Sequence, residues 1–348
     1  MNKCIFFAIS LSVSSLLFSC KPDDTPNTGG NGENTPQERL AEGIYEPDNK
    51  ISSVAYDGVT EEQWSWADRR LDHVSYEYGS MITCGYNGDY LSTVTSVEDG
   101  ITMESRFFYN DGFLSNYEIY QDNMLVVSAR VTHNASNKIS NTVFTISDEY
   151  IEMIMGDIFG MKTLSNIVGE RVAQSVLRMA KLKALDSDKA ELTGTSVVAA
   201  YDWEGDNVVE ERMSLSVNMT LSAEELSMLE TMFGVDVPDA IISLIGSTGL
   251  PLQIAMADTM SYTYDDKRNP YCYCWVEGIT ATTLSCNNPV SVAESGNESI
   301  AISMMGQVVP LQESPYESNS IFVYTYNEAN CPISVVSNDG SSKTITYN

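Results

Sequence analysis

Residues 86–94 have the sequence Tyr-Asn-Gly-Asp-Tyr-Leu-Ser-Thr-Val: an aromatic residue, a turn, then a strand-forming run. The same order returns 23 residues later (109 − 86) as Tyr-Asn-Asp-Gly-Phe-Leu at 109–114, and in degenerate form at 133–139. Related copies lie at 201–209, 262–271, 286–290 and 324–333. Asn-Gly and Asp-Gly supply the positive φ angles of tight hairpins, and a period of about 22–24 residues has room for two strands and two turns. The pattern therefore predicts a mainly β body, a meander of repeated antiparallel hairpins.

We expect these hairpins to pair edge to edge into an extended curved sheet. Two stretches depart from the β pattern. Ile151, Ile154 and Ile158 have helical spacing, and Ser-Ala-Glu-Glu at 222–225 has the pattern of a capping box before an apolar run. The sequence therefore predicts two helical insertions, at about 148–185 and 222–247, packed on one face of the sheet.

The N-terminus has the pattern of an export signal. Residues 1–19 hold one Lys and a short apolar run, which ends in Leu-Phe-Ser-Cys at 17–20. This ending resembles the bacterial lipobox, which implies cleavage before Cys20 and acylation of its thiol and new amine. Several acyl chains would anchor the protein stably in outer-membrane lipid. The alternative is an ordinary cleaved signal with a chance Cys. Residues 20–43 then form a flexible tether, and 44–348 form the body.

The charge excludes two classes of partner. The chain of 348 residues has 19 Lys and Arg against 48 Asp and Glu, a net charge of −29. Nucleic-acid binding needs clustered Lys and Arg for phosphate contacts, so we expect no nucleic-acid partner. Adsorption of the body onto an anionic lipid surface is disfavoured for the same reason.

Five cysteines remain in the body after Cys20 is assigned to lipid: Cys84, Cys272, Cys274, Cys286 and Cys331. An odd number in an oxidising compartment leaves at least one thiol unpaired. Cys272 and Cys274 lie two residues apart on an expected strand, where a bridge between them would break the strand. One disulfide to Cys286 or Cys331, or none, stays open.

A search for catalytic chemistry finds no nucleophile elbow, zinc-binding helix or phosphate loop in the sequence. His73 and His133 are expected to be structural or surface residues. Carboxylates around Trp203 have the pattern of a hairpin turn with solvated acids. We therefore expect no enzyme activity, no cofactor and no metal site.

The lipobox, the Tyr-x-Tyr pairs and the Asn-Pro turns together resemble a group of uncharacterised Bacteroidetes outer-membrane lipoproteins, distantly similar to the Tyr-Asp repeats of Rhs-type surface proteins. The likeness covers 50–348 in patches, strongest at 81–117, 201–209 and 261–335. Lys-Pro-Asp-Asp at 21–24 resembles the tag that sends such lipoproteins to the outer face of the outer membrane. The resemblance implies an all-β body on the cell surface and transfers no catalytic residue.

The function that we expect is a surface-exposed lipoprotein that binds a glycan or a surface protein without catalysis. Trp203, Tyr262 and Tyr264 are the candidate ligand contacts, because exposed aromatic rings stack on sugars. One alternative is a surface glycoside hydrolase that uses a carboxylate pair. A weaker one is a carrier of an apolar ligand. The sequence sets neither the ligand nor the oligomeric state.

Overall fold

The computed structural model describes residues 38–98, 100–147, 196–221, 250–304 and 307–348. Cys20, the signal peptide and most of the tether lie outside the described residues, and so do the two stretches expected to be helical. In the described part of the chain, no helix is long and apolar enough to cross a membrane.

The described chain is almost entirely β. A short hairpin comes first, made of β1 (Arg39–Ala41) and β2 (Ile44–Glu46). The remaining strands follow in chain order: β3 (Ile51–Tyr56), β4 (Val59–Ala67), β5 (Arg70–Tyr76), β6 (Met81–Asn87), β7 (Tyr90–Glu98), β8 (Ile101–Asn110), β9 (Phe113–Gln121), β10 (Met124–His133), β11 (Ile139–Ile146), β12 (Ser196–Glu204), β13 (Asn207–Leu221), β14 (Leu250–Tyr264), β15 (Pro289–Met304), β16 (Gln307–Tyr326), β17 (Pro332–Ser337) and β18 (Ser342–Tyr347).

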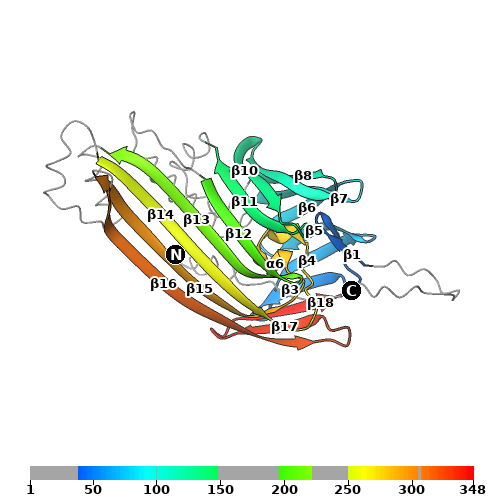
Figure 1. The fold of residues 1–348 in the computed structure, drawn as a ribbon. Coiled ribbons are helices and arrows are strands. Elements are labelled where there is room, and N and C mark those ends of the chain that lie inside the picture. The colour runs from blue at the N-terminus through cyan, green and yellow to red at the C-terminus, as the bar shows by residue number, and fades with distance from the viewer. Residues whose placement is uncertain (1–37, 99, 148–195, 222–249, 305–306) are drawn as a thin grey trace.

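These sixteen strands form one closed antiparallel barrel (Figure 1). Each strand pairs with its neighbours in the chain, and β18 closes the barrel on β3, with Lys343 opposite Tyr56 and Tyr347 opposite Ile51. The loops at the seam are joined as well, because the Asp57 N–H donates to the Ser342 carbonyl at 2.9 Å. Closure gives every described barrel strand a partner on both sides, although β16 pairs with β17 only through Phe322–Tyr326.

The expectation of an extended curved sheet is therefore wrong, because the sheet closes on itself; the two stretches expected to be helical lie outside the described residues. Each hairpin repeat specifies pairing with its neighbours, but nothing local in the sequence states that the last strand meets the first. In the described part of the chain, the helical turns are η1 (Trp275–Glu277) and α6 (Ala281–Leu284), and both lie in the connection between β14 and β15.

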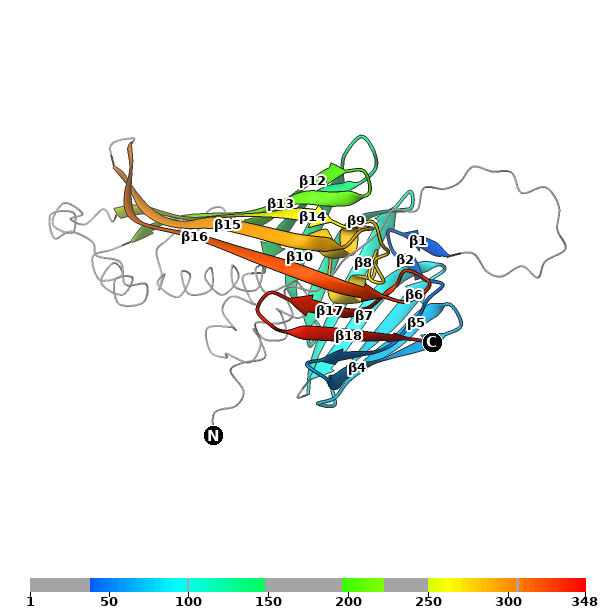
Figure 2. The same cartoon turned by 90° about the horizontal axis from the view of Figure 1, so that it is seen from below.

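The barrel is asymmetric along its axis. Strands β13, β14, β15 and β16 have 15, 15, 16 and 20 residues, whereas β3–β11 have 6 to 10. Figures 1 and 2 show the four long strands running well beyond the shorter ones on one side. The β14–β15 connection lies at the opposite end, which is also the end that holds the Asn-Gly and Asp-Gly turns after β6 and β8.

Buried and exposed side chains alternate along the strands of the barrel wall. On β8, Met103 and Phe107 are 0% and 7% exposed inside the barrel, while Glu104 and Arg106 face outward and form an ion pair. On β14, buried Met256 is followed by exposed Ala257. This period of two is what a β-strand imposes when only one of its faces is buried.

Candidate functional site: the plugged end of the barrel

Residues 265–288, the β14–β15 connection, fold into the barrel and are here called the plug. Asn269 is 2% exposed and ties the plug together: its side-chain amide donates to the carbonyls of Thr282 at 3.0 Å and Ser285 at 2.8 Å. A capping box starts α6, because the Thr283 N–H donates to the Thr280 hydroxyl and the Thr280 N–H donates to the Thr283 hydroxyl. These local bonds satisfy backbone groups that no strand partner could reach.

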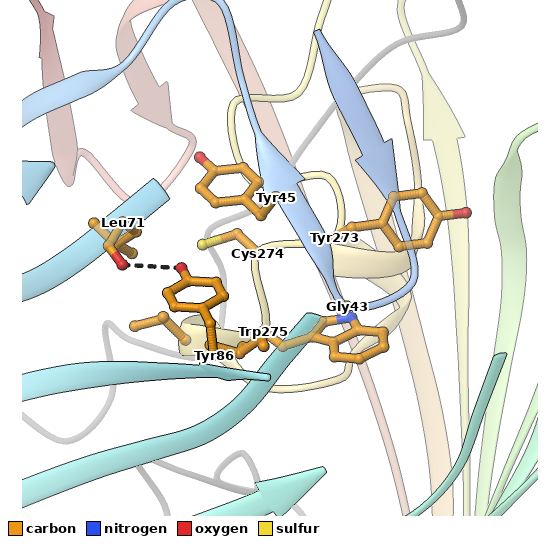
Figure 3. A pocket seen from close by; sticks show the side chains of 9 residues that line it. Gly43, Tyr45, Leu71, Tyr86, Tyr273, Cys274 and Trp275 are labelled. Atoms are coloured by element: carbon orange, nitrogen blue, oxygen red, sulfur yellow. Dashed lines mark hydrogen bonds between the residues drawn. The ribbon is translucent and has the colours of Figure 1, made fainter. Parts of the chain in front are cut away.

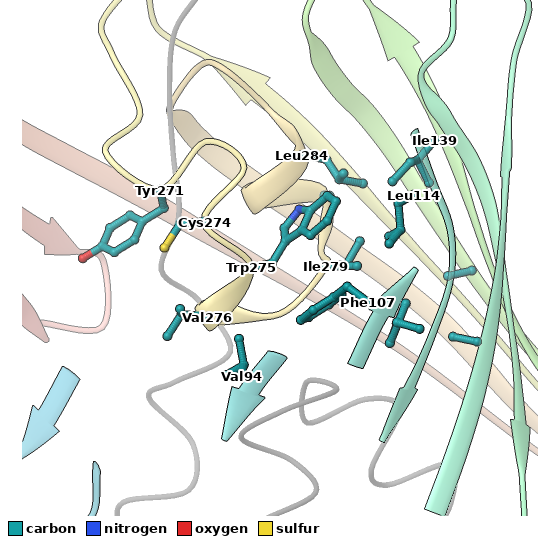
Figure 4. Close-up of a cluster of buried hydrophobic side chains, with 14 of the residues drawn as sticks. Val94, Phe107, Leu114, Ile139, Tyr271, Cys274, Trp275, Val276, Ile279 and Leu284 are labelled. Carbon is teal, nitrogen blue, oxygen red and sulfur yellow. The ribbon is translucent and has the colours of Figure 1, made fainter. Parts of the chain in front are cut away.

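Trp275 is the centre of the plug. Its side chain is 2% exposed, and its ring centroid lies 5.6 Å from that of Phe107 and 6.1 Å from that of Tyr109. Figure 4 shows Trp275, Ile279 and Leu284 of the plug meeting side chains from the barrel wall. The plug therefore fills this end of the barrel with a packed apolar core.

The repeat found in the sequence has its structural counterpart around the plug. Every even-numbered strand from β4 to β18 has a shift in pairing register directly before an aromatic or imidazole ring. These rings belong to Trp66, Tyr86, Tyr109, His133, Trp203, Tyr264, Tyr326 and Tyr347. At each shift, the strand that follows in the chain (β3 in the case of β18) has one extra residue, so two of its residues lie opposite one residue of the even-numbered strand. This is the arrangement of a β-bulge.

Rings from successive repeats donate hydrogen bonds to carbonyls at these bulges. The Tyr86 hydroxyl donates to the Leu71 carbonyl at 2.9 Å (Figure 3), and the Tyr109 hydroxyl donates to the Leu91 carbonyl at 2.8 Å. The same bond runs from Trp66 to Ile51, Trp203 to Ile139, Tyr264 to Val208 and Tyr347 to Pro332. On β16 the donor to the Pro289 carbonyl is Tyr324, two residues before the bulge ring Tyr326. We call this series the aromatic ladder. It gives each of these bulge carbonyls the partner that it needs.

Two of the eight bulge rings make other links: the Tyr326 hydroxyl donates to the Asp265 carboxylate, and His133 contacts a carboxylate of the β1–β2 hairpin. His133 has no carbonyl partner of this kind; its Nε2 lies 3.0 Å from the carboxylate of Glu42, which is 8% exposed. The same carboxylate accepts from the Leu114 N–H at 2.9 Å. Glu42 belongs to the β1–β2 hairpin, so this pair fastens the hairpin to the plugged end.

The space left between plug and hairpin is small. A pocket lined by Gly43, Tyr45, Tyr86, Cys274 and Trp275, among others, has room for about one water molecule (Figure 3). This pocket, in the part of the chain that the structure describes, is too small for a sugar.

The predicted ligand contacts lie in this interior. The ring N–H of Trp203 donates to the Ile139 carbonyl at 2.7 Å, and the Lys138 ammonium sits 4.9 Å from its ring. Tyr262 is 7% exposed and donates to the Glu211 carboxylate, and its ring centroid lies 6.3 Å from that of Tyr264. The structure brings the two Tyr rings together on β14 and keeps Trp203 apart on β12. Their role as ligand contacts stays a prediction.

One carboxyl at the plug is perturbed. Asp265 accepts from Asn288 at 2.7 Å and from the hydroxyl of Tyr326. Burial raises the pKa of Asp265 to about 6, and these hydrogen bonds offset only part of that effect. Among the described residues, no three His, Cys, Asp or Glu side chains are grouped as a metal site would need.

Sequence reasoning missed Trp275, Asn269 and Glu42. The run Tyr-Cys-Tyr-Cys-Trp at 271–275 was expected to be a strand, and the structure folds it into the plug instead. A usable signal was Asn269-Pro270, since a proline is disfavoured inside a central strand.

Comparisons with known proteins add little. No protein-family profile and no curated protein sequence matches the chain. A structural match is a porin-like protein from Bacteroides uniformis, at 11% identity over 88% of this chain and all of the other, with a TM-score of 0.24. A closed β-barrel is compatible with an outer-membrane protein. The likeness is too weak to assign a family, and the resemblance to Bacteroidetes lipoproteins stays a prediction.

Proposed function

We propose that the protein is a noncatalytic binding module of the outer-membrane surface. In this proposal, lipid on Cys20 holds the chain to the membrane, and the barrel itself stands in water. The observation that supports it most directly is the distribution of side chains on the two faces of the barrel wall.

A membrane-spanning barrel has an apolar outward band and a polar lumen. At the positions described on β8 and β14 the order is reversed. On β8, Glu104 and Arg106 face outward and Met103 faces inward; on β14, Ala257 faces outward between Ser214 and Asn297 of the neighbouring strands. An outer face of this kind suits water better than lipid, so a lipid anchor supplies the membrane attachment.

The plug argues against a transport pore. Trp275 and the residues packed on it fill one end of the barrel. A water-filled channel would need a polar, open lumen at that end.

For the partner, a surface protein is favoured over a glycan. The three rings expected to stack on sugars face the interior. By contrast, Ile321, Val323 and Val336 are exposed at 47%, 66% and 44%, and Val323 lies directly opposite Val336 on the neighbouring strand. Exposed apolar groups of this kind occur at protein contacts. In native gels cast with polysaccharides, we expect neither retardation nor cleavage; cleavage of any polysaccharide would overturn the noncatalytic assignment.

Attachment can be tested by comparing two forms of the protein in a bacterium with an outer membrane. The first is the natural chain. The second has residues 21–348 behind a signal that is cleaved without lipidation. We expect the natural chain in the membrane fraction and accessible to protease on intact cells. The unlipidated form should be released in the soluble fraction with the same β-rich circular dichroism.

Membrane attachment of the unlipidated form would contradict the proposal. If the unlipidated form stays in the outer membrane through carbonate and urea washes, the barrel itself is embedded. The proposal would then be wrong.

A further inference from the structure

The two halves of the plug bring two thiols together. Cys272 is 1% exposed, and its Sγ lies 2.8 Å from the Sγ of Cys286. A disulfide bond is about 2.05 Å long, so less than about 1 Å of movement separates this arrangement from a bonded pair.

The backbone holds these residues in place independently of the thiols. The Tyr273 N–H donates to the Thr283 carbonyl at 2.7 Å, which joins the two halves of the plug between the cysteines. The Cys286 N–H donates to the Asp206 carbonyl at 3.0 Å and fixes that end to the β12–β13 turn. The thiols therefore meet because the plug is folded, which is the preorganisation that a disulfide needs.

The other cysteines of the described chain lie elsewhere. Cys274 lines the small pocket together with Tyr45 and Tyr86 (Figure 3). Cys331 points its Sγ toward the Ala329 carbonyl, 3.8 Å away in the β16–β17 turn. Cys84 is on β6. The geometry thus selects one pair among the five body cysteines.

We propose that Cys272 and Cys286 form a disulfide that ties the two halves of the plug together. The two thiols lose two protons and two electrons and form one S–S bond. The oxidant is itself a disulfide, of a small molecule or a protein, and is reduced to two thiols through a mixed disulfide. Natural exposure to such an oxidant rests on the proposed location outside the cytoplasm, but the pairing can be tested on purified protein.

The test uses the purified full chain, first reduced and then incubated with oxidised glutathione. Remaining thiols are blocked with N-ethylmaleimide, and the chain is digested without reduction by trypsin and glutamyl endopeptidase. Cleavage after Arg268, Glu277 and Glu294 releases the peptides 269–277 and 278–294. We expect mass spectrometry to find these two peptides joined, and the joined mass to disappear on reduction.

Serine variants assign the link. Cys272→Ser and Cys286→Ser should each abolish the joined peptide. Cys274→Ser, the matched control two residues away, should keep it in full. Retention in Cys272→Ser, loss in Cys274→Ser, or both peptides alkylated in the natural chain would overturn the proposal.

Stability gives a second measurement. The bond would close a loop of 15 residues (286 − 272 + 1). Reduction should therefore lower the Tm of the oxidised natural chain by about 5 °C, and leave that of the double Cys272→Ser, Cys286→Ser variant unchanged. An equal Tm in both redox states of the natural chain contradicts the proposal. If the link forms in vitro but is missing in protein alkylated directly in intact cells, the proposed location fails while the pairing stands.

Discussion

The hydroxyl of Tyr86 is the simplest rung of the aromatic ladder to test. Its ring is partly buried, and its hydroxyl donates to the Leu71 carbonyl at the bulge of the preceding repeat, 2.9 Å away. Tyr86→Phe keeps the ring and leaves that carbonyl without this donor. We expect a loss of about 1 kcal/mol in the free energy of unfolding, the usual cost of removing such a bond. Urea denaturation followed by circular dichroism measures it.

Tyr78 supplies the matched control, since its side chain is 76% exposed in the β5–β6 turn. Tyr78→Phe should change the free energy of unfolding by less than about 0.5 kcal/mol. Equal effects of the two substitutions would show that the ladder bond contributes nothing specific.

Asp265 should make stability depend on pH. Its pKa is about 6 in the folded chain and about 3.9 in the unfolded chain, so the folded state binds the proton more tightly. This contribution to stability is fully present below about pH 4 and is lost as pH rises through 6. Asp265→Asn should remove this slope and stabilise the protein at pH 7.5 relative to the natural chain. Because the carboxyl is only half-buried, we expect about 1 kcal/mol rather than the full value of the shift.

Urea titrations of both chains at pH 4 and pH 7.5 give the comparison. Asp266→Asn is the control, because the neighbouring Asp266 is exposed and pairs with Lys267 at 2.9 Å. An unchanged pH slope in Asp265→Asn would contradict the assignment.

At this scale, the sequence allows the repeated rings to be found but not their partners. Tyr86 and Tyr109 were recognised from spacing alone. Their acceptors are the carbonyls of Leu71 and Leu91, which become available only because a bulge opens the strand pairing there. A carbonyl is present at every residue, so no side-chain pattern marks these acceptors.

Among the elements, the plug has the strongest expected effect on stability. Trp275 is 2% exposed and contacts the rings of Phe107 and Tyr109. Trp275→Ala should cost about 3–5 kcal/mol, because it removes a large buried ring and leaves a cavity. The same change should speed the reaction of the Cys274 thiol with a thiol reagent, since Cys274 lines the pocket beside Trp275.

Phe108→Ala is the corresponding control, with a ring 40% exposed on the outer face of β8. It should cost less than about 1 kcal/mol and leave the labelling rate of Cys274 unchanged. A stable Trp275→Ala variant with slow labelling would mean that the plug does not depend on its central ring.

The plug shows why an element can escape sequence analysis. Residues 271–275 alternate ring and thiol as a strand would, and local alternation alone favours a strand. The barrel interior overrides that preference, because burying Trp275 and Tyr271 inside it removes more apolar surface from water. The predicted helices at about 148–185 and 222–247 lie outside the described residues.

On the scale of the whole molecule, closure is the feature that local patterns could not give. The seam joins residues almost 300 positions apart: the Ser342 N–H donates to the Asp57 carboxylate at 2.8 Å, with a sequence separation of 285. Hairpin signals act over about 10–25 residues. They set the strand order here. The same hairpins occur in a sheet with two free edges and in a closed barrel, so they do not distinguish the two folds.

The two faces of the wall allow a decisive test at neighbouring positions of β14. Ala257 is exposed, with Ser214 and Asn297 opposite it on the adjoining strands; Met256 is 7% exposed and faces inward. If the outer face meets water, Ala257→Lys should change the free energy of unfolding by less than about 0.5 kcal/mol. Met256→Lys should cost about 2 kcal/mol or more, since it removes a buried apolar side chain and moves a charge from water into the barrel interior, even with the Asp258 carboxylate nearby.

A lipid-facing wall predicts a different pattern for the same two variants. Lysine at a lipid-exposed midplane position costs about 2–4 kcal/mol, so Ala257→Lys would then fold poorly in bilayers and release the chain from the membrane. Measuring both variants in detergent-free buffer and in lipid vesicles separates the cases. A barrel that folds in buffer with Lys at 257, and binds vesicles only when lipidated, is one that the membrane holds by its N-terminus.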